Sequence, residues 1–218
     1  DAVQNVFAQA YKNAGCHVVN KPNVEDVDGK LLIPDHLVLG NGTESGQGLM
    51  VDYRHTDSGQ TNPLDFSEHM LKSDIEKIGK YNAAVSRSGH RFMPIILDKF
   101  GNVLQKTRDM LFQMFIRKVS NDRHDITETE ADFIATKKTN FWLKRASAAM
   151  AKTKAMCIIN RSTKLIAIQH EKKHGKGSKN SSTYFDNRID IEQESDVLIA
   201  DYSFDECNYF KEDDDICA

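Results

Sequence analysis

The sequence predicts an α/β fold whose core runs helix, strand, strand, strand, helix, strand over residues 1–103. Apolar residues recur every three or four positions in two segments of this region, which is typical of amphipathic helices. Four other segments are rich in β-branched and apolar residues and are bounded by glycine, proline or polar turns. A chain of 218 residues with 39% apolar content is long enough for one such domain plus an appendage.

The first helix is expected over residues 2–14, where Gly15 is placed to end it. The apolar positions that share its buried face are Val3, Val6, Phe7, Ala10, Tyr11 and Ala14. A short β-prone run follows at residues 16–19. Two longer β-prone segments, 31–39 and 48–56, are separated by a glycine-rich stretch, and together they predict a hairpin.

The second half of the core is a long helix over residues 66–88, with Gly89 as its C-cap, and a strand over residues 91–100. Two further helices, 104–119 and 128–154, are expected to pack on this core. Residues 175–182 read as a linker, and the polar remainder is expected to be poorly ordered. We therefore divide the chain into a core (1–103), a helical extension (104–174) and a linker with an acidic tail (175–218).

Charge is distributed unevenly along the chain, although the net charge is only −3. Between residues 137 and 179 Glu171 is the only acidic residue among many lysines and arginines. Such a segment is compatible with contacts to a phosphate backbone, and acids dominate after residue 186. The residues we assign to nucleic-acid binding are Arg54, Lys137, Lys138, Lys144 and Arg145. The acidic tail either shields the basic segment or is simply solvated.

The sequence contains no apolar run of about 20 residues and no signal-peptide pattern, so we expect a soluble intracellular protein without a membrane partner. The four cysteines form no CxxC pair, which argues against a zinc site or a disulfide framework. The chain begins at Asp1 inside a helical pattern, as a piece of a longer polypeptide would. The sequence does not indicate an oligomeric state.

Asp35 and Asp52 are the most informative residues, because they fall on the two arms of the predicted hairpin within apolar surroundings. Adjacent strands lie about 5 Å apart, so carboxylates at corresponding positions can share one divalent cation. A lone buried carboxylate would be costly, and a metal removes that cost. Hard oxygen ligands favour Mg²⁺ or Mn²⁺, which can support phosphodiester hydrolysis.

A protein cation usually completes such a site, and the candidates are Arg54 on the second arm and Lys77 or Lys80 on the following helix. Lys77 and Lys80 share a helix face, which also carries Tyr81 one turn after Lys77. We favour Lys80. Arg54 cannot carry a proton but can clamp phosphate. His36 and His55 alternate to the opposite strand face or lie at the strand end, so we do not assign them a catalytic role.

The segments IPDHLVL, LMVDYRHT, EKIGKY and HRFMPIILDKFG, in this order, resemble the restriction-like endonuclease domain of the PD-(D/E)XK type. That domain is found near the C-terminus of reverse-transcriptase polyproteins of non-LTR (LINE-type) retrotransposons. The resemblance covers residues 1–160 and includes NFWLKRASAAMAKTKAMCI, which is similar to a helical segment that trails the domain. It implies a restriction-endonuclease-like core and an active site of Pro34, Asp35, Asp52, Lys80 and Tyr81, with Lys77 a less certain match.

The resemblance implies a Mg²⁺- or Mn²⁺-dependent endonuclease that nicks target DNA in the nucleus. The exposed 3′ end would prime reverse transcription by the reverse-transcriptase portion of the same polyprotein. Arg54 stands where the D-x-K pattern has lysine, so the cation must come from the helix. Two alternatives stay open: an inactive retroelement relic that still binds nucleic acid, and an unrelated interaction domain.

Overall fold

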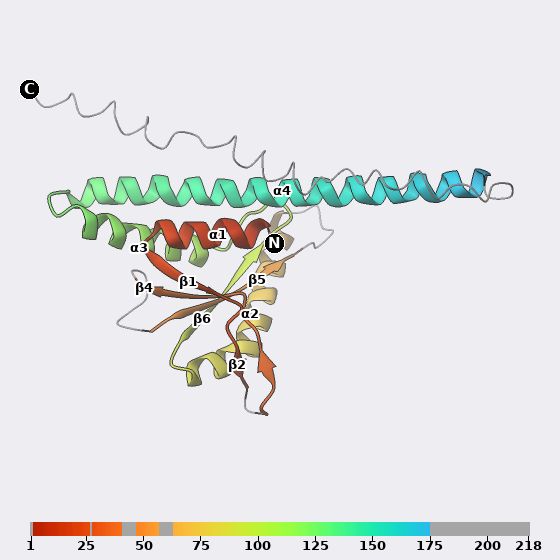
Figure 1. Cartoon of the computed structure of the whole chain (residues 1–218). Helices are drawn as coiled ribbons and strands as arrows, with labels where there is room; N and C mark the ends of the chain where they lie inside the picture. Colours follow the sequence, from red (N-terminus) through yellow and green to blue (C-terminus); the bar gives the residue numbers. More distant parts are fainter. Residues whose placement is uncertain (1, 27, 41–46, 57–62, 175–218) are drawn as a thin grey trace, which may run out of the picture. The chain divides into compact units, whose positions relative to one another are not determined.

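The computed structural model describes residues 2–26, 28–40, 47–56 and 63–174, and it confirms the mixed α/β class (Figure 1). The chain divides into two compact units, residues 1–162 and 163–218. The sheet and the helices packed on it belong to the first unit. The predicted linker and acidic tail lie outside the described residues.

A four-stranded mixed sheet forms the centre of the first unit, in the order β1-β4-β5-β6. The strands are β1 (Cys16–Asn20), β4 (His36–Gly40), β5 (Leu49–His55) and β6 (Arg91–Leu97). The β1–β4 and β4–β5 pairs are antiparallel, whereas β5 and β6 are parallel because helix α2 (Pro63–Arg87) connects them. The predicted hairpin is thus confirmed as β4 and β5.

The segment predicted as one strand over residues 31–39 is divided at Pro34. Its first part is β3 (Leu31–Leu32), which pairs with β2 (Val24–Glu25) in a separate two-stranded sheet, and its second part is β4. Proline lacks the N–H that a ladder needs, so the strand is interrupted there. The chain re-enters the main sheet directly after Asp35.

Helices cover both faces of the main sheet. Three of them, α1 (Ala2–Asn13), α3 (Gln105–Asp122) and α4 (Glu128–His174), gather on one side (Figure 1). They bury one apolar cluster against the odd-numbered β5 residues Val51 and Tyr53. Helix α2 covers the other side, where Tyr81 and Val85 pack against Met50. Both expected extension helices therefore pack on the sheet.

Helix α4 ends about twenty residues later than the sequence pattern predicted, at His174 rather than at residue 154. Residues 155–174 contain neither glycine nor proline, so nothing in this stretch breaks the helix. Within the described ranges, no helix combines the length and the apolar character that crossing a membrane requires.

Candidate active site

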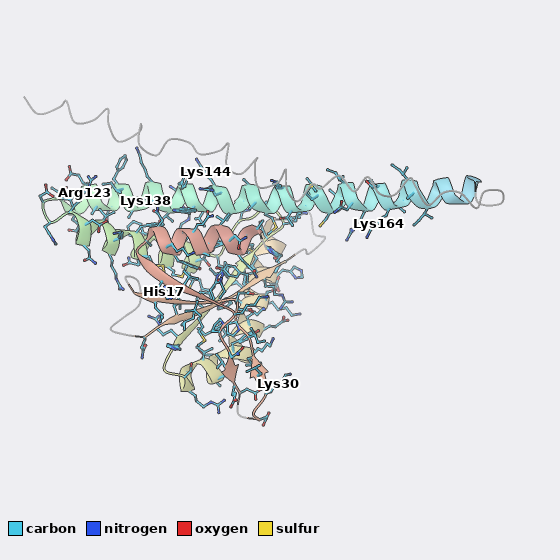
Figure 2. All side chains as sticks on the ribbon, viewed as in Figure 1. His17, Lys30, Arg123, Lys138, Lys144 and Lys164 are labelled. Carbon is cyan, nitrogen blue, oxygen red and sulfur yellow. The ribbon has the colours of Figure 1, made fainter. Side chains whose placement is uncertain are left out.

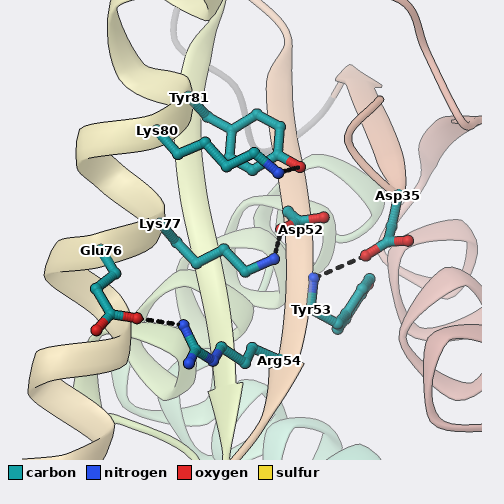
Figure 3. A network of polar contacts seen from close by, with 8 residues as sticks. All are labelled: Asp35, Asp52, Tyr53, Arg54, Glu76, Lys77, Lys80 and Tyr81. Atoms are coloured by element: carbon teal, nitrogen blue, oxygen red, sulfur yellow. Dashed lines mark hydrogen bonds and ion pairs between the residues drawn. The ribbon is translucent and has the colours of Figure 1, made fainter. Parts of the chain in front are cut away.

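The pairing of β4 with β5 ends at His36 and Val51, and Asp35 and Asp52 are the next residues of the two chains beyond that pair (Figure 3). His36 pairs with Val51, and the Asp35 N–H also donates to the Val51 carbonyl at 3.0 Å, so Asp35 and His36 both face Val51, as in a β-bulge that ends the ladder. Alternation along β5 places Asp52 on the same face as Met50, which packs against α2. The two predicted acids therefore meet on the α2 side of the sheet.

The Asp35 carboxylate is held at the end of β4 by the backbone of β5. Its Oδ2 accepts a hydrogen bond from the Tyr53 N–H at 2.8 Å. The side chain thus takes the place of a backbone carbonyl where the pairing of the two strands ends. The Asp35 carbonyl also accepts from the Lys21 N–H at 2.8 Å. Backbone and side chain are both anchored, and the carboxylate has a defined position.

Asp52 is a buried carboxylate, 5% exposed, in contact with the ammonium group of Lys77. Burial raises the pKa of Asp52, and the neighbouring Asp35 carboxylate raises it further, while the contact with Lys77 opposes the rise. The charge of Asp35 acts on Asp52 in this way because the two side chains lie near each other (Figure 3). The pair thus concentrates negative charge where it is poorly solvated.

The cation that reaches Asp52 is Lys77, not the favoured Lys80. Lys80 lies one turn further along α2, where its Nζ donates to the Tyr81 hydroxyl at 3.0 Å and lies 4.5 Å from the centre of the Tyr81 ring (Figure 3). Tyr81 is buried and stacks on Phe92, with ring centres 5.0 Å apart. Tyr81 therefore acts as a rigid support that positions Lys80.

Arg54 extends the site along β5, because it lies two residues after Asp52 on the same strand face. Its guanidinium donates to the Glu76 carboxylate at 2.5 Å. Arg54, Glu76, Lys77 and Lys80 line a pocket of about 420 Å³. Sequence reasoning missed Glu76, although it stands four residues before Lys80 and so on the same helix face, a spacing that could have drawn attention to it.

Of the two histidines that we left without a catalytic role, His55 is the last residue of β5 and His36 faces away from the acids. His36 points to the opposite face of the sheet, where its Nδ1 is 3.0 Å from the Tyr53 hydroxyl, which in turn donates to the Tyr11 hydroxyl at 3.3 Å. Burial lowers the pKa of His36, which favours a neutral ring. This buried network lies on the face of the sheet opposite the acids. Two of its members, His36 and Tyr53, directly follow Asp35 and Asp52 in the sequence.

The two carboxylates have the donor chemistry that Mg²⁺ or Mn²⁺ prefers, since these ions bind few protein carboxylates and keep other oxygen ligands. A buried acid with a raised pKa next to a second acid is also the electrostatic situation that a divalent cation relieves. Across the described ranges, no group of three or more His, Cys, Asp or Glu side chains is arranged to hold a metal. Asp35 and Asp52 are the two carboxylates of this site that would hold such an ion.

The basic residues assigned to nucleic-acid binding at positions 137, 138, 144 and 145 belong to α4, which packs on the face of the sheet opposite α2; Figure 2 labels Lys138 and Lys144. Lys144 is exposed and Lys138 is partly buried. Lys137 lies 4.3 Å from the centre of the Phe133 ring, and the Arg145 guanidinium lies 5.0 Å from that of Trp142. Among the predicted DNA contacts, only Arg54 is brought to the acids.

No protein-family model matches this chain, and no curated protein is significantly similar to it in sequence.

Proposed function

We propose that this protein is a metal-dependent DNA endonuclease with a restriction-endonuclease-like core. The observation that carries the proposal is the pair of facing carboxylates, Asp35 and Asp52, on adjacent strands with Lys77 in contact with Asp52. The element order and the antiparallel hairpin followed by a parallel strand agree with the core that the sequence resemblance implies. The departure at Arg54 is compensated, because Lys77 supplies the cation from α2.

The substrate we propose is a phosphodiester because the charges around the acids suit an anion that carries its own oxygen ligands. Arg54, Lys77 and Lys80 line the pocket beside Asp52; Arg54 is paired with Glu76 and Lys77 with Asp52, so these three cations are balanced by the carboxylates of Glu76, Asp52 and Asp35 as long as no metal is bound. A divalent cation held by the two aspartates would give the site an excess of positive charge, which a phosphodiester would offset and a neutral substrate would not. A scissile phosphate would face both the acids and the cations.

Each side chain has a distinct role in this proposal. Asp35 and Asp52 would hold Mg²⁺ or Mn²⁺, which supplies Lewis-acid stabilisation of phosphate and water when bound. Lys77 orients Asp52 and stabilises negative charge that develops on the phosphate. Lys80, held by Tyr81, binds a non-bridging phosphate oxygen, and Arg54 leaves Glu76 to clamp the adjacent phosphate.

The cellular role proposed on the resemblance is target-primed reverse transcription. The enzyme would nick nuclear DNA, and the reverse-transcriptase portion of the same polyprotein would extend the exposed 3′ end. Nicking of one strand is the activity that this role requires.

Supercoiled plasmid is the direct substrate for a test. With Mg²⁺ or Mn²⁺ we expect conversion to the open-circular form, and Asp35→Asn and Asp52→Asn should each lower the rate about 100-fold or more, as the loss of a group that stabilises transition-state charge does. Asp132→Asn changes an exposed acid on α4 and should leave nicking unchanged. DNA binding without any nicking by the unaltered chain would instead favour the inactive relic.

Lys77 is tested in the same assay against a lysine of the same helix. Lys77→Ala should lower nicking on the same scale as the aspartate variants, because it removes the cation from Asp52. Lys72→Ala removes an exposed lysine that stands five residues before Lys77, about 140° around α2 from it, and should have little effect because it cannot replace the contact with Asp52. Equal losses in both variants would mean that the helix contributes only non-specific positive charge.

A further inference from the structure

A second pocket, of about 330 Å³, lies on the other side of the sheet between the turn after β6 and the helices α3 and α4. Gly101 and Asn102 come from the turn, Arg108 from α3, and Asn140, Lys144 and Ser147 from α4. The pocket is separate from the one beside Asp52, and the proposed mechanism does not use it.

The turn that forms one wall is rigid. Asp98 is buried and accepts hydrogen bonds from the N–H groups of Phe100 and Asn102, each at 2.8 Å, and from the Asn102 side-chain amide at 2.7 Å. Its negative charge is therefore used within the turn. Gly101 has a φ of +85° and lies so near α4 that a Cβ there would come within 2.5 Å of the Ser147 Cα. The turn and α4 thus enclose a pocket of fixed shape.

The side chains that line this pocket give it a positive charge. Arg108 and Lys144 are both exposed, and the residues that line it include no acid. Arg108 donates to the Asn140 side-chain oxygen at 2.6 Å, which fixes the guanidinium while its other N–H groups remain donors. The amide nitrogen of Asn140 is a further donor. Two cations with neutral donors in a preformed pocket are suited to phosphate.

The pocket lies at the same edge of the sheet as Arg54. β5 and β6 are parallel, and His55 pairs with Leu97, so both strands end at that edge. Arg54 is the penultimate residue of β5, and Gly101 follows β6 by four residues. Lys154 bridges the turn and α4 by donating to the Lys99 carbonyl at 2.6 Å, and the pKa of His55 is lowered by burial and, to a lesser extent, by the charge of Lys154. Basic groups therefore continue from the candidate active site to the second pocket.

We propose that the pocket of Arg108, Asn140 and Lys144 binds a backbone phosphate of the DNA whose scissile phosphate lies at Asp35 and Asp52. The inference rests on the proposed function for the identity of the ligand. This contact would be independent of the base sequence. It would fix the position at which the DNA backbone crosses the edge of the sheet.

The salt dependence of DNA binding tests this contact, because each neutralised phosphate contributes about −0.9 to the slope of log affinity against log salt. We would measure fluorescence anisotropy of a 30-bp duplex in EDTA with the full chain at several KCl concentrations. Arg108→Gln/Lys144→Gln should reduce the magnitude of the slope by about 1, the contribution of one phosphate. The matched control is Arg117→Gln/Lys118→Gln, which removes the same charge from α3; Arg117 is exposed and lies about two and a half turns after Arg108, on the opposite face.

A slope that falls no further in the Arg108/Lys144 variant than in the control would overturn the inference, as would a failure of the unaltered chain to bind DNA. A thermal shift with inorganic phosphate that this variant loses, together with an unchanged DNA slope, would assign the pocket to a free anion and also overturn it. The proposed function can fail independently of this inference. If the slope depends on Arg108 and Lys144 but the unaltered chain does not nick plasmid, the phosphate site is supported and the nuclease activity is contradicted.

Discussion

Asp52 bears the main electrostatic cost of the candidate site, since its ionised carboxylate is buried beside Asp35. Its pKa in the folded protein is raised above the ordinary value of 3.8, so the folded state binds the proton more tightly than the unfolded state does. Stability from this group is present at low pH and is lost as pH rises from 3.8 through the raised pKa. Such a cost is expected where a function requires the charge.

We predict that Asp52→Asn stabilises the protein near neutral pH while it abolishes nicking. The amide removes the buried charge and can still accept a hydrogen bond from Lys77, so the gain should be about 1 kcal/mol. Thermal melts from pH 4 to pH 8 should show the variant gaining on the unaltered protein as pH rises. A variant that is less stable at every pH would mean that the Lys77 ion pair outweighs the burial of Asp52.

From the sequence it could be predicted that Asp35 and Asp52 come together, but not which lysine contacts Asp52. Asp35 and Asp52 are placed by strand register, which the hydrophobic pattern reveals. Whether Lys77 or Lys80 reaches Asp52 depends on the rotation and shift of α2 against the sheet. Packing of Tyr81 on Phe92 sets that rotation, and periodicity within the helix does not show it.

The turn after β6 makes a contact between elements that could not be predicted from the sequence. It was predicted only as the end of a strand, yet it joins the sheet to α4 through Gly101 and Ser147. The short strand β2 was missed because two residues are too few for a periodic signal. The extent of α4 was underestimated because its core-facing pattern fades before the helix ends.

We predict that Gly101→Ala destabilises the protein by about 3 kcal/mol. The new Cβ would meet the Ser147 Cα, which is backbone and cannot rotate away, and alanine is strained at a φ of +85°. Gly29→Ala is the matched control, with a φ of +73° and no atom within 4 Å of the added Cβ, so it should cost only about 1 kcal/mol. Urea denaturation measures both, and equal losses would show that backbone strain alone is responsible.

For the first unit as a whole, the core is shared between the sheet and the C-terminal helices. Leu111 and Phe115 of α3 and Trp142 of α4 are buried in the same cluster as Val51 and Tyr53 of β5. The sequence predicted these helices but not how much of the core they supply, because the pattern of one segment does not identify its partner. The division at residue 103 stays a prediction.

We predict that a fragment of residues 1–103 does not fold alone. Without α3 and α4 one face of the sheet would expose a large apolar surface, which a domain of this size cannot afford. Circular dichroism should show no cooperative thermal transition for 1–103, whereas residues 1–162 should unfold in a single transition. Cooperative unfolding of the shorter fragment would establish the core as an independent domain.

The pairing of Asp35 with Asp52 also bears on how freely the sequence between them can change. The pairing of β4 with β5, which ends at His36 and Val51, brings the two carboxylates together, and the count of intervening residues does not. Lengthening the connection between β4 and β5 adds little closure entropy, since each doubling costs only about 0.6 kcal/mol. Insertions there would leave the acids in place. The interval between such acids is thus free to drift among related chains, and a search that demands a constant interval would pass over proteins with the same arrangement.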